Sequence, residues 1–288
     1  MSIANRIFSL IAGITLFVSI SLSPVLAQEN NSNTPTYKVT FIAQLVADGT
    51  PVENGLEWRI FGSTINSDGN LPMLASANGG TKTFNISAGQ YLVHAAYGHA
   101  SAVRKIEIGP ESGEEYFILN AGGMELSAIA GEDTPISNDL LRFDVFEQKI
   151  DERGERKLIA KRVLPGEIIP FQEGTYHVVS QFGDLNAEIR ADIRVTAGKV
   201  TKAQLKHRAA RVTLRLVRSI GSDALANTQW SVLNESGELI TESTSAFPRI
   251  VLSEGNYTAI AKNGDSIYSN DFTVIPGVNR DVEVLVAG

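Results

Sequence analysis

Few residues of this chain belong to the types that carry out chemistry, and their spacing does not assemble a catalytic set. The chain has no Cys, which excludes thiol catalysis and thiolate metal ligands. Sequence motifs of phosphate-binding loops, dinucleotide-binding turns, serine hydrolases and zinc proteases are missing. The chain has 32 Asp and Glu residues, but no two of them stand in a context typical of glycosidase carboxylates. We therefore assign no catalytic, cofactor-binding or metal-binding residue, and we expect no cofactor and no enzyme activity.

Four His residues are the remaining candidates for a metal site. His94 and His99 are five positions apart, so in one continuous strand their side chains would point to opposite faces. A turn at Gly98 could bring them nearer, but no third ligand is evident. We expect both to be ordinary exposed or hydrogen-bonded strand residues. His207 lies between two basic residues and is expected to contact solvent.

Two polar turns are candidates for ligand binding. The stretch 66–70 (NSDGN) has oxygen-bearing side chains at alternate positions, as calcium loops do, but it lacks the distal Glu of an EF-hand. The same residues are typical of a hairpin turn, which is the interpretation we favour. The stretch 151–157 (DERGERK) is dense in charge and predicts a solvated hairpin tip, with a protein contact as the alternative.

The first residues indicate export. Arg6 is the only charged residue in the first 27, an apolar run follows over 7–22, and residues 25–27 read Val-Leu-Ala. This arrangement predicts a secretory signal peptide that is cleaved after Ala27, with an uncleaved anchor as the alternative. The apolar run is shorter than the roughly 20 residues that a membrane span needs. No Cys follows for a lipid anchor, and no other stretch could span as a helix, so we expect a bacterial protein of the periplasm or cell surface without a transmembrane segment.

The charge of the chain excludes one class of partner. The net charge is −7, and acidic and basic residues are mixed along the sequence. Nucleic acids and anionic lipids require a basic face. We therefore expect no nucleic-acid partner, and the charges are better explained as a soluble surface.

One pattern occurs three times. The motif apolar-x-x-Gly-x-Tyr occurs at 86–91 (ISAGQY), 171–176 (FQEGTY) and 252–257 (LSEGNY). Successive copies are 85 and 81 residues apart. A second Gly follows each Tyr by seven positions and predicts a hairpin turn. Such a recurrence at near-constant spacing predicts three tandem repeats.

Each repeat also contains an alternating strand upstream of its Gly-x-Tyr. An aromatic residue occupies its centre at Trp58, Phe143 and Trp230, which we expect in the core. The Tyr rings should pack inward while their hydroxyl groups find backbone partners. Short strands with frequent turn signals predict an all-β chain of three Ig-like or transthyretin-like β-sandwich modules. The predicted boundaries are a signal peptide over 1–27, a disordered leader over 28–36, and β-sandwich repeats over 37–121, 122–209 and 210–288.

The late Gly-x-Tyr in an all-β unit of this size resembles the carboxypeptidase-regulatory-like and Cna B-type modules. The resemblance covers nearly all of 37–288, once per repeat, and the chain is also similar to a group of exported alphaproteobacterial repeat proteins. It implies small sandwiches that serve as spacers, stalks or binding units. In some Cna B-type modules a Glu shortly before the Gly-x-Tyr promotes a Lys–Asn or Lys–Asp isopeptide bond. Here Glu173 and Glu254 directly precede the Gly and Ala88 takes that place in the first repeat, so we expect no isopeptide.

These features favour an exported, non-catalytic scaffold protein of the cell envelope. Its short links at 121–123 and 205–211 should make the modules abut, and loops or exposed sheet edges would bind an envelope or surface protein. A glycan-binding protein is the alternative, although both Trp residues occupy the predicted core position. A hydrolase with an unrecognised site is a third hypothesis.

Overall fold

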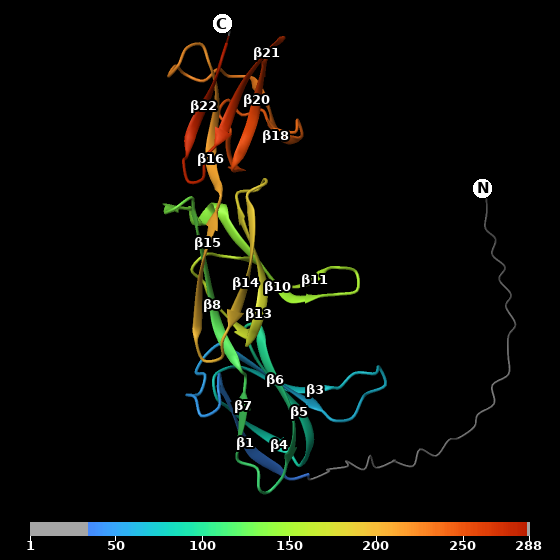
Figure 1. Cartoon of the computed structure of the whole chain (residues 1–288). Coiled ribbons are helices and arrows are strands. Elements are labelled where there is room, and N and C mark those ends of the chain that lie inside the picture. The colour runs from blue at the N-terminus through green and yellow to red at the C-terminus, as the bar shows by residue number, and fades with distance from the viewer. Residues whose placement is uncertain (1–33, 287–288) are drawn as a thin grey trace, which may run out of the picture. The chain divides into compact units, whose positions relative to one another are not determined.

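The computed structural model describes residues 34–286 (Figure 1). The predicted signal peptide over 1–27 lies outside these residues, as does the predicted leader over 28–36 except for its last three positions. Within the described residues the protein is an all-β chain of separate sheets, with one short 3-10 helix at Asn138–Leu140. None of the helical structure between residues 34 and 286 is long and apolar enough to cross a membrane.

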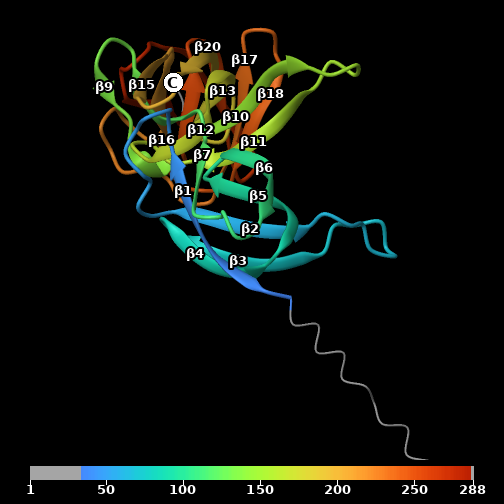
Figure 2. The same ribbon diagram turned by 90° about the horizontal axis from the view of Figure 1, so that it is seen from below.

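Two sheets and one hydrophobic cluster are built from residues 36–121, and we call them the N-terminal sheet pair (Figure 2). The strands are β1 (Thr36–Gln44), β2 (Leu56–Gly62), β3 (Met73–Gly79), β4 (Lys82–Ser87), β5 (Gly89–Tyr97), β6 (Ala100–Ile108) and β7 (Glu114–Ile118). One sheet has the order β4-β1-β7, and the other has the order β3-β2-β5-β6. The first strand begins one residue before the predicted start of the repeat.

The next strands form the central sheet pair. They are β8 (Ala121–Ala130), β9 (Thr134–Pro135), β10 (Leu141–Ile150), β11 (Arg156–Val163), β12 (Ile168–Gln172), β13 (Gly174–Phe182), β14 (Glu188–Val195) and β15 (Val200–His207). One sheet has the order β12-β8-β15 with β9 paired to β8, and the other has the order β11-β10-β13-β14.

The last strands form the C-terminal sheet pair. They are β16 (Ala209–Val217), β17 (Thr228–Asn234), β18 (Leu239–Ser243), β19 (Arg249–Ser253), β20 (Gly255–Asn263), β21 (Ser266–Val274) and β22 (Arg280–Leu285). One sheet has the order β19-β16-β22, and the other has the order β18-β17-β20-β21. All three pairs therefore share one pattern of strand order.

The predicted core aromatics occupy equivalent places in the three hydrophobic clusters. Trp58 and Phe143 are completely buried, and Trp230 is 2% exposed. Each Trp also satisfies its indole N–H. Trp58 Nε1 donates to the carbonyl of Gly80 at 2.9 Å, and Trp230 Nε1 donates to the carbonyl of Ser245 at 3.0 Å. The prediction of these core positions is confirmed.

The repeated Tyr makes the same contact in every copy. The hydroxyl group of each Tyr donates to the backbone carbonyl four residues earlier, at distances of 2.8, 2.8 and 3.0 Å. The three contacts are Tyr91 to Ser87, Tyr176 to Gln172, and Tyr257 to Ser253. The contact ties the start of each Tyr strand to the end of the preceding strand. The predicted backbone partners for these hydroxyl groups are therefore confirmed.

In each smaller sheet, the strand that comes first in the sequence pairs in parallel with the strand that comes last in the sequence. These pairs are β1 with β7, β8 with β15, and β16 with β22. The last two strands of each sheet pair belong to different sheets. For example, β6 pairs with β5 in one sheet while β7 pairs with β1 in the other. Sequence periodicity identifies strands but does not say which strand is the neighbour.

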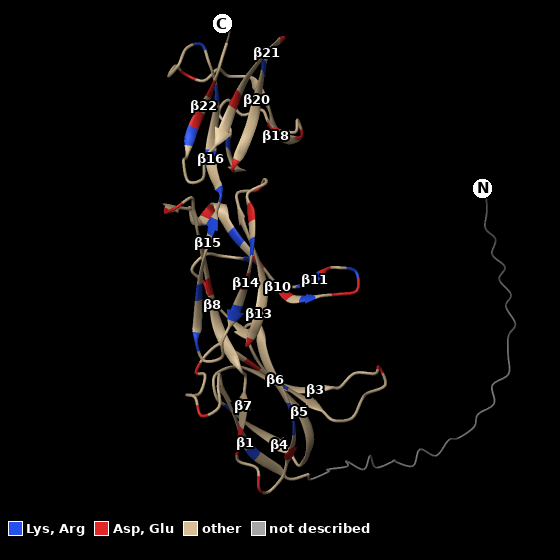
Figure 3. Ribbon diagram, in the orientation of Figure 1, with Lys and Arg blue, Asp and Glu red and all other residues tan. Residues whose placement is uncertain are grey.

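The sheet pairs are joined without linkers, and residues from Pro35 onward form one compact unit. Ala209 belongs to the central hydrophobic cluster and Ala210 to the C-terminal one, although they are consecutive residues of β16. At the other joint, Ala121 completes the N-terminal cluster, and Met124 of the same strand belongs to the central cluster. Basic and acidic residues are mixed on all three sheet pairs (Figure 3).

Candidate functional site

The outer faces of the four-stranded sheets carry a recurring row of side chains. In β2, the alternation of the strand buries Trp58 and Ile60, so Phe61 points to the opposite, outer face. The equivalent residues of the other two copies are Phe146 and Leu233, and each of the three is paired with one residue on either neighbouring strand. We call the set of four aligned residues across each sheet the outer row. The three outer rows are Met73–Phe61–Leu92–Lys105, Leu158–Phe146–His177–Asp192, and Leu239–Leu233–Thr258–Asp271.

One end of each outer row is apolar and exposed. Met73 is 58% exposed, Leu158 is 42% exposed and Leu239 is 50% exposed. Each of them lies on the edge strand of its sheet, next to a large apolar residue of the adjacent strand. Single exposed apolar residues are common on protein surfaces. Their recurrence at one position in three copies, however, is a feature of the repeat.

The other end of each row is polar and differs between the copies. In the central row His177 Nδ1 lies 2.8 Å from the carboxylate of Asp192. In the C-terminal row the hydroxyl group of Thr258 donates to Asp271 Oδ1 at 2.7 Å. The N-terminal row ends in Lys105. The apolar end is therefore the shared part of the row, and the polar end is the variable part.

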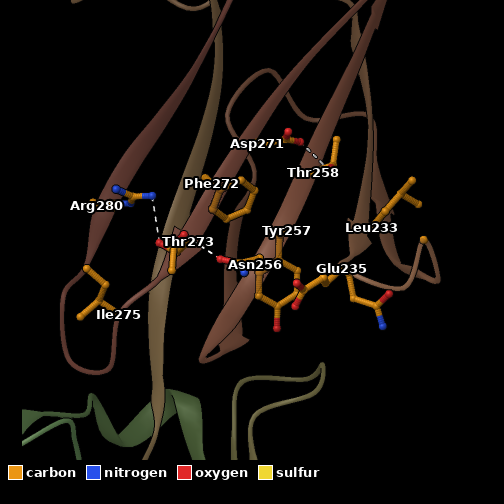
Figure 4. Close-up of a pocket in the computed structure, with 12 residues that line it drawn as sticks. Leu233, Glu235, Asn256, Tyr257, Thr258, Asp271, Phe272, Thr273, Ile275 and Arg280 are labelled. Carbon is orange, nitrogen blue, oxygen red and sulfur yellow. Dashed lines mark hydrogen bonds between the residues drawn. The ribbon is translucent and has the colours of Figure 1, made fainter.

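A groove of about 610 Å³ is lined by three of the four residues of the C-terminal outer row, Leu233, Thr258 and Asp271 (Figure 4). A second polar pair lies beside the Thr258–Asp271 pair, because the hydroxyl group of Thr273 donates to Asn256 Oδ1 at 2.8 Å. Arg280 Nη2 donates to the backbone carbonyl of Thr273 at 2.9 Å. Leu233 and Ile275 contribute the apolar part of the lining. The groove thus offers hydroxyl, amide and carboxylate groups next to aliphatic surface.

The charge-dense stretch 151–157 forms the tip of the hairpin between β10 and β11, and six of its seven residues are exposed. Asp151 Oδ1 accepts hydrogen bonds from the backbone N–H groups of Arg153 and Glu155, which closes the turn. Lys157 pairs with Glu147 at 2.8 Å. The prediction of a solvated hairpin tip is confirmed. Whether the tip contacts a protein stays a prediction.

The suspected calcium loop is a hairpin turn. Asn66 Oδ1 accepts hydrogen bonds from the backbone N–H groups of Asp68 and Asn70, at 3.1 and 2.9 Å. This side-chain oxygen is therefore occupied by the turn itself. Over residues 34–286, no group of three or more His, Asp and Glu side chains is arranged to hold a metal ion.

His94 and His99 do not meet at one site. His94 lies within β5, between Arg59 of β2 and Val103 of β6. His99 follows the turn at Gly98, and its ring stacks on Phe171 of the central sheet pair with centroids 5.0 Å apart. Partial burial lowers the pKa of both residues, and Arg59 adds to the effect at His94.

Close backbone approach distinguishes the two joints from the equivalent hairpin of the C-terminal pair. Gly98 has φ +57°, and a Cβ there would lie 2.8 Å from the Cδ and carbonyl oxygen of Pro170. Gly183 has φ +70°, and a Cβ there would lie 2.7 Å from Val251 Cβ. The third equivalent, Gly264, has open space at this position. At both joints, the hairpin after the Gly-x-Tyr strand is therefore a contact point with the following sheet pair.

The prediction for His207 is wrong. His207 is 1% exposed, and its Nε2 lies 2.8 Å from the hydroxyl group of Ser180, which is completely buried. Its Nδ1 has no hydrogen-bond partner among the described groups. Burial lowers the pKa of His207 to about 4. Lys206 of β15 and Arg208, which directly follows the strand, are exposed, and His207 between them points inward, as alternation along an extended chain requires.

The two glutamates considered for an isopeptide lie at the surface. Glu254 forms two hydrogen bonds with the guanidinium group of Arg208, at 2.5 and 2.7 Å, and this contact lowers the pKa of Glu254. Glu173 is exposed. Their backbone N–H groups donate to the carbonyl groups of Asn120 and Arg208, both at 2.7 Å, and the N–H group of Ala88 donates equivalently to Pro35 at 3.1 Å. These bonds continue the antiparallel ladders of β12 with β8, β19 with β16 and β4 with β1, so the repeated role of this position is a backbone contact within one sheet.

Sequence reasoning did not single out the outer rows. The signal was present in the alternating strands, because an apolar residue follows the inward aromatic by three positions at Phe61, Phe146 and Leu233. An apolar residue at an outward position contradicts the alternation and could have been recognised as surface. Its partners Met73, Leu158 and Leu239 could not be identified without the strand register.

The comparison with family models matches one part of the chain. Residues 211–286 match a family described as the Rhizobiales growth-associated tandem repeat domain. The matched stretch lies within the predicted third repeat over 210–288. The comparison with curated proteins gives no match.

Solved structures give matches of low similarity. A streptococcal ancillary pilin is 12% identical over 86% of this chain and 99% of its own, with a TM-score of 0.29. BcpA, the major pilin subunit of Bacillus cereus, is 10% identical over 88% of this chain and 100% of its own, with a TM-score of 0.24. The TIE protein of Bacillus anthracis is 15% identical over 88% of this chain, with a TM-score of 0.25, and the chain spans half of its length. By its sequence, the chain is similar over residues 211–286 to the Rhizobiales growth-associated tandem repeat domain.

Proposed function

We propose that this protein is an exported, non-catalytic scaffold of a bacterial cell envelope that binds a protein partner. The observation that carries the proposal is the apolar end of the outer row, which is exposed at Met73, Leu158 and Leu239. Exposed apolar groups on a sheet face are typical of surfaces that contact other proteins. Three copies along one chain would let weak contacts act together, which raises the overall affinity.

Three further points support the proposal. The predicted signal peptide would deliver the chain to the periplasm or the cell surface. The match to a growth-associated repeat domain supports a role in bacterial growth. Division into three modules, at the predicted boundaries 37–121, 122–209 and 210–288, agrees with the three hydrophobic clusters and gives each module one outer row.

Cross-linking of a tagged copy in the native host, followed by mass spectrometry, tests the proposal. We expect recovery of one envelope protein at high yield. The triple variant Met73→Glu, Leu158→Glu and Leu239→Glu should reduce that recovery by about tenfold or more, because it places charge at all three apolar ends.

A matched control adds three negative charges elsewhere on exposed strand positions. Gln90→Glu, Gln204→Glu and Ser269→Glu lie outside the outer rows on the same three sheet pairs and are exposed. This variant should recover the partner as the parent does. Equal loss in both triple variants would contradict a role for the outer rows.

A glycan-binding protein is the second candidate, and the groove over the C-terminal outer row is the observation in its favour. Its paired side chains, Thr258 with Asp271 and Thr273 with Asn256, offer the hydrogen-bonding groups that sugars require. Trp58 and Trp230 are buried, so neither forms an exposed stacking platform. Recovery of no protein, together with retention on purified envelope glycan, would reject the protein-binding proposal and favour this one.

A further inference from the structure

The edge strand β3 differs from its counterparts. Six strands form the outer edges of the three four-stranded sheets: β3, β6, β11, β14, β18 and β21. Of these six, β3 alone contains no Asp, Glu, Lys or Arg (Figure 3). An edge strand presents unpaired N–H and C=O groups, and proteins commonly protect such edges with charged side chains. The edge at β3 lacks this protection.

The internal repeat shows what the other copies have at the same place. Ser76 of β3 pairs with Arg59 of β2. The equivalent residue of β18 is Glu242, which pairs with Ser231. In β11 the basic Arg162 lies here, and its backbone N–H donates to Asp144 Oδ1 at 2.7 Å. Both other copies therefore carry a charged residue at the position where β3 carries a serine.

The sequence of β3 is self-complementary in size. If two copies of the strand run antiparallel with Ser76 facing Ser76, then Met73 faces Gly79 and Leu74 faces Asn78. Large side chains are then opposite smaller ones, and no like charges are opposed. The strand β11 could not pair with itself in this way, because its four basic residues would repel one another. Met73 and Leu74, exposed by 58% and 57%, would be partly covered by the contact.

We propose that β3 is a self-association edge, at which two copies of this protein pair antiparallel about a two-fold axis through Ser76. The contact joins two four-stranded sheets into one continuous eight-stranded sheet. Such a contact is isologous, since each copy contributes the same strand. The contact covers Met73, which the function proposed above also uses, but it is tested at Ser76, which is not part of an outer row, so the two proposals can fail separately.

The cysteine-free chain allows a direct test. In Ser76→Cys the only two thiols of a dimer would lie opposite each other, and directly opposed residues of antiparallel strands have Cα atoms about 4.5–5.5 Å apart, which is within the range of a disulfide. Mild oxidation should give a disulfide-linked dimer. The control Ser269→Cys places a thiol on the edge strand β21 at an exposed position and should stay monomeric. Equal cross-linking of both variants would overturn the proposal.

Charge substitution gives an independent test by sedimentation. Ser76→Lys and Ser76→Glu each place like charges on the two-fold axis and should each weaken self-association by about tenfold. A mixture of the two should associate at least as well as the parent, because Lys then faces Glu. Ser269→Lys and Ser269→Glu should behave as the parent. A parent protein that stays monomeric at about 100 μM, the range expected for a small interface, would overturn the proposal, as would a mixture that shows no recovery.

Discussion

The Nε2 atom of His207 lies 2.8 Å from the hydroxyl oxygen of Ser180 inside the central hydrophobic cluster. The repeat shows what this position holds elsewhere. His207 directly precedes Arg208, and Leu119 directly precedes Asn120. The carbonyl groups of Arg208 and Asn120 accept equivalent backbone hydrogen bonds, from Glu254 and Glu173 respectively. In the N-terminal pair the buried residues are accordingly Leu119 and Ala95, both apolar. The fold itself therefore does not require a polar pair at this place.

The buried histidine should make stability depend on pH. The pKa of His207 is about 4 in the folded protein and about 6.5 in the unfolded chain, so the unfolded chain binds the proton more readily. Stability is then complete above pH 6.5 and is lost as the pH falls toward 4, by about 2 kcal/mol at pH 5 and about 3 kcal/mol in total. Urea denaturation at pH 7 and at pH 5 measures the difference.

The double variant His207→Leu with Ser180→Ala serves as the control. It gives the central cluster the same apolar pair that the N-terminal cluster has at Leu119 and Ala95. It should lose most of the change in stability between pH 7 and pH 5. His94 and His99, whose pKa values are also lowered, are present in both proteins and cancel in the comparison. Equal pH dependence in parent and variant would show that His207 is not the titrating group.

Truncation of the core aromatic should destabilise its own sheet pair. Phe143 is completely buried, so Phe143→Ala should lower the free energy of unfolding by about 3–5 kcal/mol through the loss of contacts and the cavity that remains. Thermal melting followed by circular dichroism measures the effect. An unchanged melting curve would contradict the assignment of Phe143 to the core, and the same holds for Trp58 and Trp230.

The repeated tyrosine contact should contribute different amounts to the free energy of unfolding in different copies. Tyr91→Phe removes one hydrogen bond to the carbonyl of Ser87 and should cost about 1 kcal/mol. Tyr257→Phe removes two hydrogen bonds: the one to the carbonyl of Ser253, and the one at 2.9 Å that the hydroxyl group accepts from Nδ2 of Asn186 in the central pair. It should lower the free energy of unfolding by about 2 kcal/mol. Urea denaturation of both variants gives the ratio. A larger loss for Tyr91→Phe would contradict this ranking.

A Cβ atom at the second joint should be harder to accommodate than one in the equivalent hairpin of the C-terminal pair. Gly264→Ala introduces only the strain of a positive φ, about 1 kcal/mol. Gly183→Ala adds a steric conflict with Val251 and should cost about 1–3 kcal/mol more. Denaturation of the two variants under identical conditions measures the difference. Equal losses would indicate that the approach of Val251 to Gly183 does not persist in solution.

The sequence allowed the strands, the core aromatics and the tyrosine contacts to be predicted, because each depends on local alternation and on one recurring motif. Trp58 and Tyr91 could be placed in this way. His207 was misplaced because its charged neighbours suggested exposure, whereas alternation in Leu205-Lys206-His207 puts the charged side chain and the imidazole on opposite faces. The outer rows depend on strand register, which local pattern does not determine.

The parallel pairing between the first and the last strand of each sheet pair determines how the chain responds to tension. The strand by which the chain enters a sheet pair and the strand by which it leaves lie side by side and parallel, as β8 and β15 do from Val200 paired with Gly123 to His207 paired with Ala130. A pull on the chain from both sides therefore acts along this ladder and in opposite directions on its two strands. The hydrogen bonds carry the load in shear and share it, so that they must break together and cannot open one after another like a zipper. A protein built in this way can hold tension between two attachment points.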